Sequence, residues 1–287
     1  MRMAAFELFR PAAHTSCVVF ASPHSGRDYP QALLERSALD ARQIRSSEDA
    51  FVDQLFSAAP EHGAPLLAAR LPRAWVDLNR AADELDPALI ENVARRAHNP
   101  RVASGLGVIP RVVAGGRPIY SGKIGLEEAR SRLDQCWTPY HTALQTLLDE
   151  AQARFGESIL IDCHSMPHEA IELAGGRGAA RPHVVLGDRY GAAAAPRVMA
   201  RIEAAFTDAG LRVARNTPFA GAYVTQAYGR PARRQHAVQI EIDRALYMDE
   251  KRVAPHEGFE AFRTRLAGVI AEIAAIGREE AGRLAAE

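Results

Sequence analysis

Short apolar runs alternate with longer amphipathic stretches along most of the chain. The short runs, many of them rich in Val, Ile and Leu, predict strands at residues 17–23, 65–71, 74–78, 107–113, 158–163, 183–187, 211–215 and 237–242. The longer stretches, with apolar residues at helical spacing, predict helices at 48–60, 125–155, 190–209 and 258–284. Within 125–155, Pro139 predicts a kink or a break, because proline has no N–H to donate to the preceding turn.

This alternation predicts an α/β fold. Continuous apolar strands separated by helices are typical of a largely parallel sheet that is covered on both faces. The link between residues 71 and 74 is too short for a helical crossover, so we expect a mixed, mostly parallel sheet. The sequence has no internal repeat and no convincing linker, and we expect one domain over residues 1–287.

Composition and charge exclude several classes of protein. Apolar residues make up 47 % of the chain, and 35 Lys and Arg balance 35 Asp and Glu, so no basic excess points to nucleic acid. No apolar span approaches the roughly 20 residues of a membrane helix, and the N-terminus makes a poor signal peptide. The cysteines (Cys17, Cys136 and Cys163) cannot all pair and lack CxxC spacing. We therefore expect a cytoplasmic protein, and nothing in the composition indicates an oligomeric state.

Two histidines follow buried strands that are far apart in the chain. His24 ends the apolar run Cys-Val-Val-Phe-Ala-Ser-Pro-His, and His164 ends Ile-Leu-Ile-Asp-Cys-His. Ligand sites of α/β sheets lie outside the carboxyl ends of strands, where two imidazoles could share one metal ion. Either histidine alone could equally be a hydrogen-bonded core residue.

A catalytic zinc ion needs a third protein ligand. Glu48 and Asp49 are candidates, because both precede the amphipathic stretch that begins at Phe51. Acidic residues at the start of a helix are also favoured by its dipole, so helix capping is an equal alternative from this pattern.

Further polar residues follow predicted strands. Asn79 and Arg80 could bind a substrate carboxylate through an amide and a guanidinium, or form a surface salt bridge. Glu241 interrupts an apolar run, and its alternation with its neighbours places it on the opposite face, either as a general base or in solvent. The turn-rich segment from Asn216 to Tyr223 could bring both of those residues over the site, or be a plain loop.

Taken together, these segments closely resemble the N-formylglutamate amidohydrolase family, in order from about residue 17 to 250. They are Ser22-Pro23-His24-Ser25-Gly26, Asp49 with Val52-Asp53, Asp77-Leu78-Asn79-Arg80, Pro139-Tyr140-His141, Ile161-Asp162-Cys163-His164-Ser165-Met166, Asn216–Tyr223 and His236–Glu241. That family is distantly similar to zinc carboxypeptidases and aspartoacylases. The resemblance implies a three-layer α/β/α fold with a mixed, mostly parallel central sheet.

The resemblance also implies an activity. It implies metal-dependent hydrolysis of the amide bond of N-formyl-L-glutamate, or of a close N-acylamino acid, to L-glutamate and formate, as in histidine degradation. The implied cofactor is one divalent metal, with zinc expected, and the implied partner is a small-molecule substrate, without nucleic acid or membrane. On the matching positions, His24 and His164 become metal ligands and Glu241 the general base. Arg80, with Asn79, becomes a carboxylate clamp that serves catalysis and substrate binding.

One departure from the carboxypeptidase pattern matters. Those enzymes have a ligand glutamate three residues after the first histidine, where this chain has Arg27. We favour Asp49 over Glu48 as the third ligand, because Asp49 matches the family's Asp-x-x-Val-Asp pattern. We expect Asp162 to orient a ligand histidine rather than bind metal.

The dicarboxylate substrate requires a second cation besides the clamp, and Arg244 and Arg215 are the candidates. Two other functions stay open. One is a carboxypeptidase-like peptidase, or a deacylase of another N-acyl compound. The other is a non-catalytic small-molecule binder on the same fold, which would have no need for Glu241.

Overall fold

The computed structural model describes residues 4–94, 99–174 and 181–277. None of the helices in these ranges combines the length and apolar character that crossing a membrane requires. Contacts divide the chain into two compact units. The first unit contains residues 1–7, 23–50 and 68–143, and the second contains residues 8–22, 51–67 and 144–287. The single domain expected from the sequence stays a prediction.

The described residues form a seven-stranded sheet in the order β1-β3-β2-β6-β9-β7-β8. Its strands are β1 (Phe6–Phe9), β2 (Val18–Ser22), β3 (Leu66–Ala69), β6 (Ser158–Met166), β7 (Val184–Gly187), β8 (Val213–Arg215) and β9 (Gln235–Asp243). The pairs β2–β6, β6–β9 and β7–β8 are parallel, whereas β7–β9 is antiparallel. The sheet is therefore mixed and mostly parallel, as predicted.

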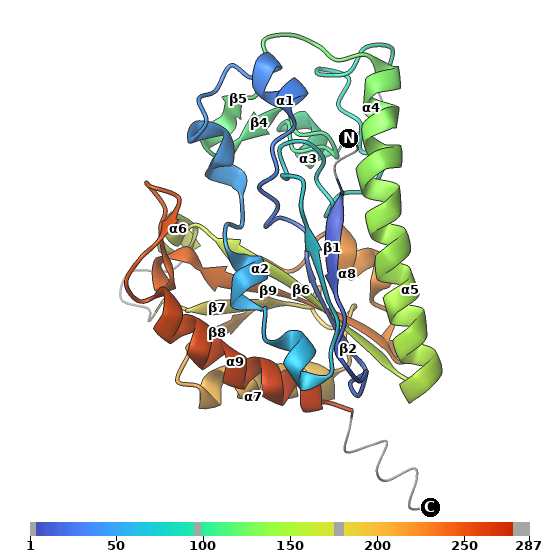
Figure 1. Cartoon of the computed structure of the whole chain (residues 1–287), viewed down its shortest axis with the longest axis vertical. Coiled ribbons are helices and arrows are strands. Elements are labelled where there is room, and N and C mark those ends of the chain that lie inside the picture. The colour runs from blue at the N-terminus through green and yellow to red at the C-terminus, as the bar shows by residue number, and fades with distance from the viewer. Residues whose placement is uncertain (1–3, 95–98, 175–180, 278–287) are drawn as a thin grey trace, which may run out of the picture. The chain divides into compact units, whose positions relative to one another are not determined.

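Helices cover both faces of this sheet, which gives the expected three-layer α/β/α arrangement. The second unit contains α2 (Val52–Leu55), α6 (His168–Ala174), α7 (Pro196–Asp208), α8 (Tyr223–Tyr228) and α9 (Phe259–Ala275). Figure 1 shows α7 and α9 on one side of the sheet and the end of α5 (Thr138–Phe155) on the other. A pair of short strands, β10 (Met248–Asp249) and β11 (Ala254–Pro255), follows β9.

The centre of the sheet has one apolar face and one face that becomes polar toward the strand ends. Phe20, Ile161 and Val238 are fully buried neighbours in register on the apolar face. Phe20 packs against Phe56 at a ring-centroid distance of 5.9 Å, and α2 contacts α9. Burial of this face drives the layers together, because each fully buried aliphatic or aromatic side chain contributes about 1.5–3 kcal/mol.

The first unit is built from short elements around a buried cation. It contains α1 (Gln31–Arg36), α3 (Pro100–Ala103), the pair β4 (Val112–Val113) and β5 (Arg117–Pro118), α4 (Leu126–Arg132) and the start of α5. The guanidinium of Arg132 lies 3.5 Å from the centre of the Trp75 ring and donates to the Tyr120 hydroxyl over 2.7 Å. This guanidinium also pairs with the Glu128 carboxylate, so an ion pair, an aromatic face and a hydroxyl acceptor together compensate for burying the charge.

Two predicted strands are largely irregular, and one strand of the seven-stranded sheet was missed, as were the two-residue strands β5, β10 and β11. The run 74–78 forms turns, and its Trp75 and Val76 amides donate to the Pro72 carbonyl instead of to a neighbouring strand. Of the run 107–113, only Val112–Val113 pairs, with β5. Both runs are apolar because they lie in the core. Burial in the core requires apolar side chains but does not require strand pairing. The missed strand, β1, has only four residues and alternates between half-buried and exposed positions.

The predicted helices are confirmed in part. The stretch 48–60 contains only α2 and a following 3₁₀ turn (Ala59–His62), and 190–209 becomes helical at Pro196. Of the stretch 258–284, Phe259–Ala275 form α9, which ends earlier than predicted at the cap residue Ile276, and residues 278–284 lie outside the described residues. The helix continues through Pro139 without a break, because a π-helical turn (Leu133–Trp137) precedes it. This wider turn relieves the proline's missing hydrogen bond and its clash with the preceding turn.

Candidate active site

Four polar side chains emerge from the same face of two neighbouring strands. In the parallel pair β6–β9, Asp162 is in register with Gln239, and His164 is in register with Glu241. Alternate residues of a strand share a face, so all four side chains lie on the face opposite Ile161 and Val238. The four residues are buried. The alternation predicted for Glu241 is therefore confirmed. The alternative that its side chain points into solvent is wrong, since only 8 % of the residue is exposed.

His164 has a carboxylate partner on its own strand. Its Nε2 lies 3.0 Å from Oδ2 of Asp162, which is fully buried. A histidine that donates one ring N–H to a carboxylate presents the lone pair of the other nitrogen, which is the usual arrangement around a metal ligand. The contact agrees with the orienting role expected for Asp162.

His24 lies just beyond β2 and is held by a second carboxylate. Its Nε2 lies 2.7 Å from Oδ1 of Asp77. Burial by itself would raise the pKa of Asp77, but the charges of Arg73 and Arg80 and the His24 contact hold it well below its ordinary value. Asp77 therefore stays ionised and fixes the Nε2–H tautomer of His24.

The local backbone allows this turn only with glycine at position 26. A Cβ on Gly26 would lie 2.1 Å from the carbonyl oxygen of Leu71. The absence of a side chain therefore lets the segment after His24 pack directly against the main chain near Leu71.

Asp49 contacts His24 twice. Its amide donates to the His24 carbonyl over 3.0 Å, and its Oδ2 lies 3.4 Å from His24 Nδ1. Helix capping is not its role, because α2 begins at Val52 and has no side-chain cap.

Glu48, the other candidate ligand, is engaged elsewhere. Arg45 donates to both of its oxygens over 2.9 Å, and the Tyr29 hydroxyl donates to Oε1 over 2.7 Å. Burial and the neighbouring Glu48 raise the pKa of Tyr29, which keeps this hydroxyl protonated as a donor. The geometry therefore favours Asp49 over Glu48 as a ligand.

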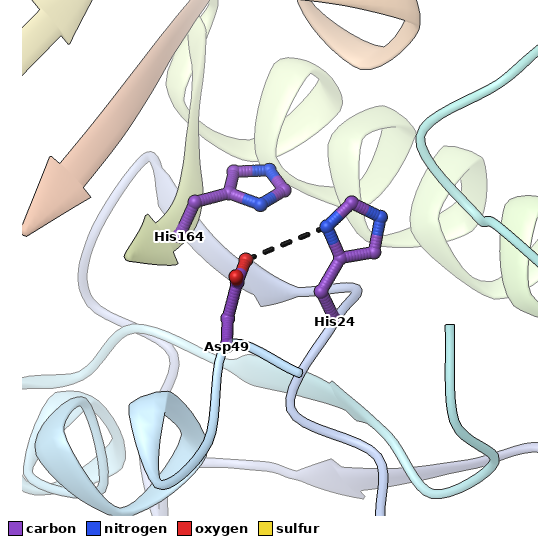
Figure 2. Close-up of side chains that lie close together, drawn as sticks. All are labelled: His24, Asp49 and His164. Carbon is purple, nitrogen blue, oxygen red and sulfur yellow. Dashed lines mark ion pairs between the residues drawn. The ribbon is translucent and has the colours of Figure 1, made fainter. Parts of the chain in front are cut away.

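His24, Asp49 and His164 form a buried group that could hold a metal ion. One ligand atom from each lies within 4.8 Å of the others. Figure 2 shows these side chains and the ion pair between His24 and Asp49. Ala21 and Asp162 are in register on parallel strands, and each histidine follows shortly after one of them in the sequence. Two imidazoles and a carboxylate, with a carboxylate behind each histidine, fit the donor set that divalent zinc prefers.

In the first unit, Arg80 is a nearly buried cation with a fixed orientation. Its Nε donates to the Leu106 carbonyl over 3.0 Å, and its Nη1 donates to the Asn79 carbonyl over 2.7 Å. Burial lowers its pKa, although Asp77 opposes this effect. Asn79 is also buried, and its backbone amide donates to Asp77 Oδ1 over 2.9 Å. This burial argues against the surface salt bridge that the sequence left open.

Two aromatic residues near the start of α5 hold the main chain on either side of Asn79. Trp137 Nε1 donates to the Arg80 carbonyl over 2.9 Å, and His141 Nε2 lies 3.0 Å from the Leu78 carbonyl. Their rings stack with centroids 4.0 Å apart. Burial lowers the pKa of His141 to about 4, so this ring is neutral at pH 7 and donates through Nε2–H.

The segment from Asn216 to Tyr223 packs against β7 in the second unit. A Cβ on Gly187, which is in register with Gln239, would lie 2.7 Å from the main chain of Ala220. The side-chain amide of Asn216 is bonded to Asp188, which follows β7: Oδ1 accepts from the Asp188 backbone amide over 3.0 Å, and Nδ2 donates to Asp188 Oδ1 over 2.9 Å. Asn216 therefore holds the segment in place. Tyr223 is half-buried at the start of α8.

The two candidates for the second cation differ in their surroundings. Arg244 follows β9, is buried, and donates through Nε to Ser165 Oγ over 3.2 Å. Arg215 is exposed and pairs with Glu203 on α7. Of the two, Arg244 directly follows the strand that carries Glu241.

Comparison with known proteins identifies the family. Residues 16–248 match the family described as N-formylglutamate amidohydrolase. The chain belongs to this family. It is 32 % identical to an N-formylglutamate deformylase of Pseudomonas aeruginosa, over 91 % of this chain and 94 % of the other. An N-formylglutamate deformylase of Pseudomonas putida is 30 % identical, over 81 % of this chain and 82 % of the other.

The fold of the N-formylglutamate amidohydrolase family is also found in a solved structure. The crystal structure of an N-formylglutamate amidohydrolase from Ralstonia eutropha JMP134 superposes with a TM-score of 0.91 at 35 % identity, and covers 97 % of this chain and 100 % of the other. The family resemblance seen in the sequence is thereby confirmed.

Sequence analysis gave no role to three residues that contact the predicted ones. Asp77 was quoted only within a motif, although a carboxylate that precedes Asn79 could have been weighed as a partner for a ligand histidine. Gln239 was likewise quoted without a role, although period-two spacing places it beside Glu241. No sequence signal pointed Trp137 at the Arg80 carbonyl.

Proposed function

We propose that this protein hydrolyses N-formyl-L-glutamate to L-glutamate and formate. One observation carries the proposal: Glu241 and His164 are buried neighbours in register on one face of the sheet, in a chain of the N-formylglutamate amidohydrolase family. A proton acceptor next to a metal-binding histidine is the arrangement that amide hydrolysis by an activated water needs. The curated relatives are deformylases of this substrate by name.

In this proposal His24, Asp49 and His164 hold one divalent metal ion, which we expect to be zinc. Their burial and their mutual distances of at most 4.8 Å support it. When bound, such an ion supplies Lewis-acid polarisation and lowers the pKa of water toward about 7. Asp77 and Asp162 orient the two imidazoles, so that each presents a nitrogen lone pair to the same point.

Glu241 moves the protons in this scheme. One carboxylate oxygen, Oε1, accepts a hydrogen bond from Gln239 over 2.8 Å, and we expect the carboxylate to take the proton of the attacking water. The same carboxyl group then delivers this proton to the nitrogen of the leaving glutamate. General acid–base catalysis by a positioned carboxylate contributes typically about 10²–10⁴-fold to a rate.

Cationic and polar side chains would bind the substrate's carboxylates. Arg80, with Asn79, is proposed for one carboxylate, and the fixed orientation of its guanidinium supports bidentate binding. Arg244 is proposed for the other, with Tyr223 as a further contact. Asn216 serves the substrate through the position of its loop, because its own amide is bonded to Asp188.

A comparison of substrates tests the proposal. Zinc-loaded protein is mixed with N-formyl-L-glutamate, N-acetyl-L-glutamate and a short peptide that ends in glutamate, and the released amine is measured. We expect kcat/KM to be highest for the formyl compound. Preference for the acetyl compound or the peptide would favour the deacylase or peptidase alternative. Binding of all three without turnover would favour a non-catalytic binder.

A further inference from the structure

The amide of Gln239 contacts the carboxylate of Glu241 on the same strand. Gln239 Nε2 donates to Glu241 Oε1 over 2.8 Å, and Gln239 is only 4 % exposed. The two residues are two positions apart on β9, so their side chains leave the same face and run side by side. An ionised carboxylate only accepts hydrogen bonds, which fixes the orientation of the amide with its nitrogen toward Glu241.

The other end of the same amide is not satisfied. Among the described residues, Gln239 Oε1 is buried and has no hydrogen-bond partner. A buried acceptor without a donor costs about 1–3 kcal/mol, so an apolar side chain would stabilise the fold better at this position. The position therefore favours a role in the reaction over a role in folding.

Space beside Gln239 is closed by the main chain of the Asn216–Tyr223 segment. Gly187, in register with Gln239 on β7, has Ala220 and Gly221 within 2.7 Å of the place where a Cβ would be. On the other side, Asp162 is in register with Gln239 on β6. The amide is thus confined between two strands, which restricts its rotamers and, through the hydrogen bond, those of Glu241.

We infer that Gln239 is a positioning residue that orients the general base Glu241 by holding Oε1 of its carboxylate. The inference rests on the proposed function. It assigns Gln239 no contact with substrate. Loss of this hydrogen bond removes the contact that orients Oε1, so we expect the rate of the chemical step to fall while substrate binding stays intact.

Gln239→Met tests this inference, because methionine keeps the length of the side chain and removes the amide. We expect kcat to fall about 10–100-fold, as for the loss of outer hydrogen-bond partners at other sites, with KM and zinc content unchanged. We also expect the melting temperature to stay equal or to rise, since the unsatisfied oxygen is removed. A residue with only a structural role would not produce lower kcat together with equal or higher stability.

Gln235→Met is the matched control, because it makes the same replacement four residues earlier on the same face of β9. It should leave kcat unchanged. Equal kcat for Gln239→Met and wild type overturns the inference, and so does a joint fall of kcat, zinc content and melting temperature. The variant Glu241→Gln distinguishes failure of the Gln239 inference from failure of the proposed function. If Glu241→Gln retains full turnover, the proposed base is wrong, whereas a dead Glu241→Gln with an unaffected Gln239→Met rejects the positioning role alone.

Discussion

Nε2 of His24 lies 2.7 Å from Oδ1 of Asp77, and both residues are buried. The carboxylate also accepts from Arg73 over 2.9 Å through its second oxygen, so its position is fixed from both sides. A ring held in this way keeps one tautomer and one orientation, which a metal ligand requires. Asp77 thereby connects the Asp-Leu-Asn-Arg segment to the proposed metal ligand.

Asp77→Asn should weaken zinc binding. The amide keeps the size of the side chain but removes the charge that holds the His24 tautomer, so we expect affinity to fall about 10–100-fold. Competition with a chromophoric chelator measures this change. Asp28→Asn is the control, because Asp28 pairs with Arg70 and is a partly exposed aspartate of the same unit. Equal affinity of Asp77→Asn and wild type would remove Asp77 from the metal site.

Arg80→Lys should impair substrate binding more than chemistry. Lysine keeps the charge and loses the planar fork, so a bidentate contact with a carboxylate is lost. Hydrogen bonds to charged groups contribute about 1.5–3 kcal/mol, which predicts a KM increase of about 10–100-fold. Steady-state kinetics measures KM and kcat separately. Arg130→Lys, on the exposed side of α4, should change neither. An unchanged KM for Arg80→Lys would contradict the clamp.

Trp137→Phe should weaken the hold on the main chain at Arg80. Phenylalanine retains a ring against His141 and removes the N–H that donates to the Arg80 carbonyl. A single hydrogen bond contributes about 0.5–1.5 kcal/mol, so KM should rise severalfold and urea unfolding should lose about 1 kcal/mol. In Trp75→Phe, which instead alters the ring beneath Arg132, KM should remain that of wild type. An unchanged KM for Trp137→Phe together with a raised KM for Trp75→Phe would show that Trp137 does not position Arg80.

His141 should make stability depend on pH. Burial lowers its pKa from 6.5 to about 4, so between these values the unfolded chain binds a proton that the folded protein does not. The free energy of unfolding therefore falls as the pH falls through this window, by about 3 kcal/mol at most. His141→Gln keeps a donor to the Leu78 carbonyl and cannot titrate. Denaturant unfolding at pH 7 and pH 5 should show a smaller loss for this variant than for wild type. Equal losses would exclude His141 as the titrating group.

The sequence predicted most of the layered fold and the polar residues that lie at the ends of its strands. His24 and His164 could be found because each ends a buried apolar run, and Glu241 because it interrupts one. The family resemblance already favoured Asp49 over Glu48, and the structure adds a physical reason, since Arg45 and Tyr29 bind Glu48. The contact between His24 and Asp77 joins residues 53 positions apart in sequence, a separation at which no local pattern applies.

The failures of sequence prediction have physical causes as well. The run 74–78 is buried, but its Trp75 and Val76 amides bond within a turn instead of to a neighbouring strand. Pro139 did not break its helix because the π-helical turn before it changes which amides need partners. In the first case tertiary packing overrode a local preference, and in the second a local change of helix type accommodated the proline.

Titration of metal-free protein with zinc tests the central claim most directly, with formate release from N-formyl-L-glutamate as the readout. We predict that activity rises linearly with added zinc and reaches its plateau at one equivalent per chain, and that His24→Ala and His164→Ala abolish this rise. Full activity in the metal-free protein, or no formate release with zinc bound to both histidines, would contradict the account.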